Sequence, residues 1–102
     1  MGREIGFSNA RVFSSLLFTM KVKKNLLSFA RFRIVVSKKT QSLAVRRNRL
    51  RRILSSCLEG IKRESLSGYD FLFIIKKEMW EKSQSETRQM IKQVFKEAGF
   101  LV

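Results

Sequence analysis

Hydrophobic and polar positions alternate in two stretches of the chain. Between residues 16 and 22 the apolar side chains fall on every second position, and residues 31–37 repeat the pattern. A period of two places successive side chains on opposite faces of a strand, so both stretches are predicted strands. Residues 69–76 contain the unbroken apolar run Phe71 to Ile75, which is typical of a central strand covered on both sides.

Two other stretches have the period of a helix. Residues 43–64 are a predicted helix because apolar side chains recur every three or four residues. They are Leu50, Ile53, Leu54, Cys57, Leu58 and Ile61. A second helix is predicted to follow Ser83 and Glu86, which have capping-box spacing, and to end before Gly99. A weaker spacing over residues 7–13 predicts a short helical turn, and Trp80 is expected to seal an edge of the core.

This order of strand, strand, helix, strand and helix predicts an α+β fold with helices on a small sheet. A chain of 102 residues is expected to form one domain, residues 1–102. If the strands before and after the first helix are parallel neighbours, their crossover should by default be right-handed.

Charge separates the two halves of the chain. The net charge is +14, and residues 5–58 hold 13 Lys or Arg without one Asp or Glu. A field of this sign attracts nucleic acid or an anionic membrane. The sequence has no run of about 20 apolar residues, so we expect no membrane span and an intracellular protein.

The basic residues are densest at the start of the predicted helix 43–64. Residues 46–52 contain five arginines and one asparagine. On a helical wheel Asn48, Arg49 and Arg52 lie opposite the apolar stripe, whereas Arg46 and Arg47 lie on its side, near the edge of the body. A solvated basic face is the alternative, but this density without a nearby acid favours a polyanion, and the helix N-terminus adds to the positive potential.

Composition excludes several chemistries. The chain has no His and one Cys, which excludes a zinc site, histidine base catalysis and a Ser-His triad. Cys57 is expected to be a buried structural thiol, and Phe71 and Phe73 to be core residues rather than a base-stacking platform. The strand face that carries Arg33 and Ser37 could hold single-stranded nucleic acid or simply face solvent.

Two stretches together resemble the protein subunit of bacterial ribonuclease P. The first is a strand that ends in Ser37-Lys38-Lys39, and the second reads Ala44-Val45, one residue, Arg47-Asn48-Arg49, one apolar residue and two basic ones. The strand led by Asp70 also matches the pattern, and the resemblance covers about residues 11–98.

The resemblance implies a two-layer α–β sandwich. Its small mixed sheet would carry the basic signature helix and a C-terminal helix, with a left-handed crossover instead of the default. The family's N-terminal helix would be reduced or absent here, because about ten residues precede Arg11. The loop at residues 40–43 is one residue longer than the pattern and lacks its glycine.

The resemblance also implies the activity. A partner RNA would hold Mg²⁺ and remove the 5′ leader from precursor tRNA, and this chain would be a monomeric, cytoplasmic subunit without catalytic or metal-binding side chains. The partners would be ribonuclease P RNA and precursor tRNA, with neither a membrane nor a small-molecule substrate.

The implied site residues form two groups. The expected contacts to the RNA core are Lys38, Lys39, Arg46, Arg47, Asn48, Arg49, Arg51 and Arg52. The expected leader contacts are Phe18, Met20, Arg33 or Val35. The alternative is a non-enzymatic basic RNA-binding module on ribosomal or other structured RNA. A DNA-binding regulator is disfavoured because no helix-turn-helix spacing occurs.

Overall fold

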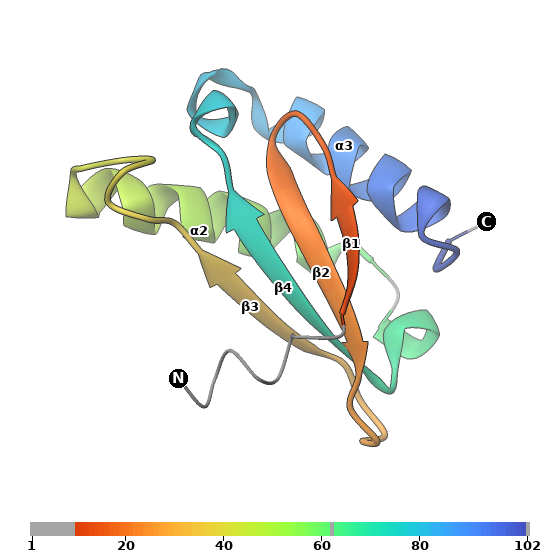
Figure 1. The fold of residues 1–102 in the computed structure, drawn as a ribbon. Helices are drawn as coiled ribbons and strands as arrows, with labels where there is room; N and C mark the ends of the chain where they lie inside the picture. Colours follow the sequence, from red (N-terminus) through yellow and green to blue (C-terminus); the bar gives the residue numbers. More distant parts are fainter. Residues whose placement is uncertain (1–9, 62, 102) are drawn as a thin grey trace.

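The computed structural model describes residues 10–61 and 63–101, and its architecture is the predicted α+β sandwich of helices on a mixed sheet (Figure 1). The elements are β1 (Arg11–Ser14), β2 (Phe18–Lys24), β3 (Arg31–Val35), α2 (Ala44–Glu59), η1 (Arg63–Leu66), β4 (Tyr69–Ile75), η2 (Lys77–Glu81) and α3 (Gln84–Glu97). Helices α2 and α3 lie on the same face of the sheet.

The sheet has the strand order β1-β2-β4-β3. Strand β4 pairs antiparallel with β2 and parallel with β3, and α2 connects the two parallel strands. In Figure 1 the arrows of β3 and β4 point the same way, α2 passes behind the sheet, and β4 lies to the right of β3. That crossover is left-handed, as the resemblance implied, and the default expectation of a right-handed connection was wrong for this chain.

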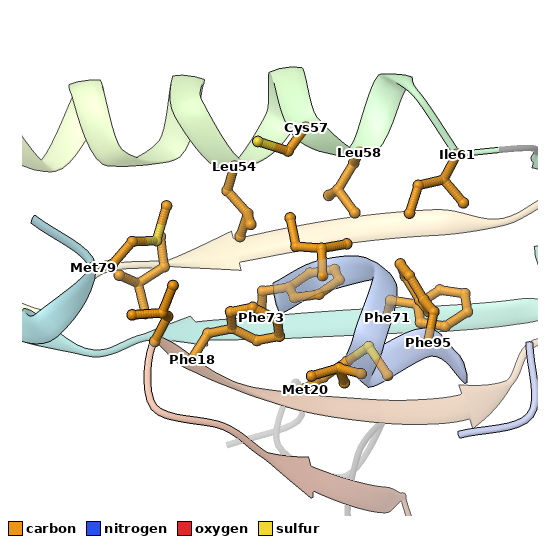
Figure 2. Packing of buried hydrophobic residues seen from close by; sticks show 14 of the residues in the cluster. Phe18, Met20, Leu54, Cys57, Leu58, Ile61, Phe71, Phe73, Met79 and Phe95 are labelled. Carbon is orange, nitrogen blue, oxygen red and sulfur yellow. The ribbon is translucent and has the colours of Figure 1, made fainter. Parts of the chain in front are cut away.

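The core lies between the sheet and the two helices. Alternation along β2 and β4 turns Phe18 and Met20 toward the same layer as Phe71 and Phe73, and all four are fully buried. Figure 2 shows Leu54, Leu58 and Ile61 projecting onto this layer from above, with Cys57 beside them on α2. Phe95 of α3 completes it, with its ring 5.4 Å from that of Phe71 in an edge-to-face arrangement.

Several boundaries differ from the prediction. Strand β2 covers Phe18–Lys24 rather than residues 16–22, and β3 ends at Val35 rather than at residue 37. Helix α2 ends at Glu59 and not at residue 64, because Gly60 forms the C-cap and the chain turns there. Ile61 is still buried, so the apolar stripe continues although the helix does not. Residues 11–14 form strand β1 rather than a helical turn, since they pair with β2. Residues 7–9 of that predicted turn, and the reduced N-terminal helix, lie outside the described residues.

The start of α3 is as predicted. The side chain of Ser83 accepts from the backbone N–H of Glu86 at 3.1 Å, and the Glu86 carboxylate accepts from the backbone N–H of Ser83 at 2.9 Å. This reciprocal capping box fixes the first turn of α3. Because α3 packs beside α2, it also fixes one wall of the surface described next.

Candidate nucleic-acid interface

The first two turns of α2 are not packed into the core. The first buried residue of the helix is Leu50, whereas Ala44, Val45 and Arg46 are exposed. Arg49 and Arg52 are exposed too, on the side that the helical wheel predicted. Helix α2 is therefore divided into an apolar part that docks and a basic part that is displayed to solvent.

Arg47 connects the helix to the loop before it. Its Nη1 atom donates to the backbone carbonyl oxygens of Gln41, at 3.1 Å, and Ser42, at 2.9 Å. The side chain is consequently half-buried, on the body side that the wheel indicated. Since two of its donor directions are used within the chain, Arg47 orders the loop as well as adding charge.

The asparagine of the arginine-rich stretch also has a structural partner. Arg51 Nη1 donates to Asn48 Oδ1 at 2.7 Å, a contact between residues three apart on one face of the helix. Asn48 thus holds one guanidinium in place without neutralising it, because an amide oxygen accepts a hydrogen bond but carries no net charge.

Lys38 and Lys39 lie in a tight turn beside this surface. The Ser37 carbonyl accepts from the backbone N–H groups of Thr40 and Gln41, and the Ser37 and Thr40 hydroxyls are 3.0 Å apart. Both lysines are exposed at the tip of this turn. The chain therefore continues its positive surface from the loop onto α2.

Acids do not neutralise the basic helix in the described part of the chain. Among the side chains that the structure describes, the one ion pair joins Arg31 to Asp70, at 2.7 Å on the sheet. That pair, together with Asn25, lowers the pKa of Asp70, and Asp70 in turn raises the pKa of Arg31. Because no described acid pairs with them, the guanidinium groups of α2 present a positive potential to solvent.

Two open grooves adjoin the arginines. One, of about 560 Å³, lies between α2 and the sheet-edge strand β3 and is lined by Phe32, Ile34, Arg51, Arg52, Ser55 and Leu58. The other, of about 350 Å³, lies between α2 and the start of α3 and is lined by Arg49, Arg52, Ile53, Ser56 and Gln84. Arg52 lines both, so the basic surface extends around the helix.

The predicted leader contacts separate into two pairs. Phe18 and Met20 are 0% exposed in the core, so they have no surface to offer and this prediction was wrong. Alternation along β2 turns them toward the helices, as their own periodicity indicated. Arg33 and Val35 are exposed on the opposite, open face of the sheet.

That open face includes residues that the sequence reasoning missed. Leu72 pairs with both Lys21 and Arg33, and Ile74 pairs with both Thr19 and Val35, so the six side chains form two rows across the sheet. The missed signal was the second face of the alternating stretch 16–22, which carries Thr19 and Lys21. A mixture of cationic and apolar side chains suits an extended single strand of nucleic acid, because the cations can contact its phosphates and the apolar side chains its bases.

Other kinds of site have little support in the described residues. The side chains that the structure describes include no group of three or more His, Cys, Asp or Glu that could hold a metal ion. None of the helices described is long and apolar enough to cross a membrane. Cys57 is buried, as predicted, and burial raises the pKa of its thiol, which keeps it protonated and unreactive.

A two-layer α+β body with an arginine helix displayed at its edge defines a class: small basic proteins whose surface is built for a polyanion. The Ribonuclease P family profile matches residues 5–99. The chain therefore belongs to the ribonuclease P protein family.

Curated relatives support this assignment. Ribonuclease P protein components from Pelotomaculum thermopropionicum and Pseudomonas paraeruginosa are 35% and 32% identical over 74 residues, which is 72% of this chain. The match spans 65% and 54% of those two proteins, respectively.

Solved structures share the fold. The RNase P protein of Staphylococcus aureus superposes with a TM-score of 0.84 at 19% identity, covering 99% of this chain and 92% of that one. The Thermotoga maritima RNase P protein gives 0.77 at 20% identity, covering 92% and 89%. At these identities the likeness establishes the architecture, which agrees with the strand order and crossover described above.

Proposed function

We propose that this chain is the RNA-binding protein subunit of a ribonuclease P, in which a partner RNA removes the 5′ leader from precursor tRNA. The observation that carries the proposal is the displayed half of α2. Its guanidinium groups are exposed or held by neutral partners, and the one ion pair in the described residues lies elsewhere, on the sheet. Family membership then supports a ribonuclease P RNA as the polyanion.

The first role of the protein would be to bind the catalytic RNA. Arg46, Arg49 and Arg52 lie on the exposed side of α2, and Lys38 and Lys39 continue the surface. Each phosphate contact releases counterions from the RNA, so the affinity should fall steeply with salt. Fixed positive charges also replace part of the cation atmosphere that a folded RNA needs, which should lower its requirement for Mg²⁺.

The second role would be to bind the single-stranded leader on the open face of the sheet. Lys21 and Arg33 offer cations there, and Leu72 and Ile74 offer apolar contacts between them. An extended strand presents a phosphate at every nucleotide and a base to stack, so both kinds of side chain would be used.

The hydrolysis itself would depend on Mg²⁺ held by the partner RNA. We assign no Mg²⁺ ligand to this chain, because in this proposal the partner RNA holds the ion. The protein would bind and orient the substrate, and the complex, with one copy of the chain, would work in the cytoplasm.

The test is cleavage of a precursor tRNA by ribonuclease P RNA at a Mg²⁺ concentration too low for the RNA alone. Four reactions are compared: RNA alone, RNA with the protein, the protein alone, and RNA with the protein on a precursor whose leader is shortened to one nucleotide. We expect the protein to restore cleavage, to have no activity alone, and to improve substrate affinity less for the shortened leader.

Two results would contradict the proposal. If the protein binds RNA without any gain in cleavage or substrate affinity, it is a non-enzymatic RNA-binding module. If the polypeptide alone removes the leader, the division of labour between RNA and protein is wrong.

A further inference from the structure

Trp80, the one tryptophan of the sequence, lies against the basic part of α2. It belongs to η2, and two elements, η1 and β4, separate it from the arginines of α2 along the chain. The guanidinium carbon of Arg46 is 5.0 Å from the centre of the Trp80 ring, and that of Arg49 is 5.7 Å away. Trp80 was expected to seal a core edge, but it is 36% exposed.

This contact supports the part of α2 that the core does not hold. Both arginines precede Leu50, which is the first buried residue of α2. They therefore lie on the part of the helix that extends beyond its buried stripe. A free arginine there would sample many rotamers. An aromatic ring attracts a cation through its negative face, and tryptophan is the strongest of the aromatic residues in this respect.

Stacking on a ring leaves an arginine able to bind phosphate. A guanidinium group is planar, its N–H donors point outward in that plane, and a ring contacts its flat face. The two arginines can therefore contact Trp80 and still donate bidentate hydrogen bonds to phosphate oxygens. An acidic partner would have fixed them as well, but it would have cancelled the charge.

Arg49 also borders a recess that a phosphate group could enter. The groove between α2 and α3 has Arg49 and Arg52 on one side and Gln84 on the other. The Gln84 amide donates to Ser56 Oγ at 3.1 Å, which holds the far wall in place. With Trp80 holding Arg49, two guanidinium groups one turn apart face the same groove.

We propose that Trp80 is a positioning residue of the RNA-binding surface, which fixes Arg46 and Arg49 so that they meet neighbouring phosphates of the partner RNA. The identity of that RNA rests on the proposed function, whereas the stack is a property of the free protein. The two can therefore be tested separately.

The stack is tested first, without RNA, by the fluorescence of the protein's sole tryptophan. Replacing Arg46 and Arg49 together by alanine should shift the Trp80 emission maximum and change its quenching by iodide. The matched control is Arg88→Ala with Lys92→Ala, which removes two charges from the exposed side of α3. Identical spectra for the arginine variant and the wild type would overturn the proposal.

RNA binding is then measured with ribonuclease P RNA for Trp80→Leu and Trp80→Phe. We expect the leucine variant, which stays apolar but loses the ring, to bind roughly 5-fold more weakly. The phenylalanine variant should bind within about 2-fold of the wild type, since it keeps an aromatic face. Trp80→Leu should cause no further loss when Arg46 and Arg49 are already alanine, because Trp80 acts through them.

The outcomes separate the two hypotheses. If the wild type does not bind this RNA, the proposed function fails and the fluorescence result still decides the stack. If the wild type binds this RNA and Trp80→Leu binds it equally well, the positioning role is wrong. The role is also wrong if Trp80→Leu lowers the affinity by the same factor in a protein whose Arg46 and Arg49 are already alanine. Circular dichroism checks folding, and if Trp80→Leu does not fold, the fluorescence comparison decides alone.

Discussion

At the residue scale, the arginine-rich stretch of α2 contains side chains with different tasks. Arg47 is bound to two loop carbonyls, Asn48 holds Arg51, and Arg49 lies over the ring of Trp80. The sequence alone could count these charges and assign the sides of the helix, because both follow from a regular period. It could not supply the partners, since the loop carbonyls and Trp80 come from segments without a repeating pattern.

The pair of Asp70 and Arg31 makes a prediction about pH. Asp70 accepts two hydrogen bonds from Arg31, at 2.8 and 2.7 Å, and one from Asn25 at 2.9 Å. These contacts, that of Arg31 above all, lower the pKa of Asp70 below its unfolded value. The pair should therefore stabilise the fold above the unfolded pKa, and this stabilisation should be lost as the pH falls through the lower, folded pKa.

Urea unfolding of the wild type and Asp70→Asn between about pH 6 and pH 2 measures this contribution. The free energy of unfolding of the variant should depend less on pH over the acidic part of the range. Arg31→Gln should remove most of the same dependence, because Arg31 is the main cause of the lowered pKa. An equal pH dependence in all three proteins would show that the pair does not contribute.

At the element scale, α2 combines a docked half and a displayed half, and the docked half can be tested alone. Leu54 is fully buried against the sheet (Figure 2), whereas its neighbour Ser55 is exposed. Leu54→Ala should cost about 2–5 kcal/mol of unfolding free energy, through lost burial and the cavity left behind. Ser55→Ala should change it by less than about 0.5 kcal/mol.

Thermal or urea unfolding of these two variants checks which face of the helix docks. Unchanged stability in Leu54→Ala would mean that α2 faces the other way, and the assignment of the displayed arginines would then fail too.

The elements that could be predicted are those with a sustained period. Strands β3 and β4 and helix α3 begin at or near the expected residues because alternation, an apolar run and a capping box specify them. Strand β1 was missed because it is a four-residue edge strand with one half-buried side chain, Phe13, too short to show alternation. The end of α2 was missed because Ile61 continues the stripe beyond the helix.

The choice of sheet face shows a different limit. Phe18 and Met20 alternate with the polar side chains of β2, which already indicated burial together with Val22. Assigning them to the leader on the basis of resemblance ignored which face the helices cover. Arg33 and Val35 lie on the uncovered face, so only this half of the leader prediction is compatible with the structure.

At the scale of the whole molecule, two binding surfaces follow from one topology. Both helices cover one face of the sheet, so the described helices leave the other face open (Figure 1). The left-handed crossover places α2 beside the edge strand β3, with its basic end beyond the sheet. Local patterns do not encode the handedness of a crossover, which is why the resemblance predicted it and the periodicity did not.

The central claim is that RNA binds to the displayed side of α2. The alternative is that it binds anywhere on the protein because the net charge is positive. The most direct test compares two variants that each lose three exposed charges from one helix: Arg46→Ala, Arg49→Ala and Arg52→Ala on α2, against Arg88→Ala, Lys92→Ala and Lys96→Ala on α3. The measurement is the affinity for ribonuclease P RNA over a range of salt concentrations.

Each lost phosphate contact should reduce the slope of log affinity against log salt by about one unit. We predict a loss of about three units for the α2 variant and less than about one unit for the α3 variant. Equal slopes for the two variants would contradict the account, because the binding would then depend on net charge and not on the surface that α2 displays.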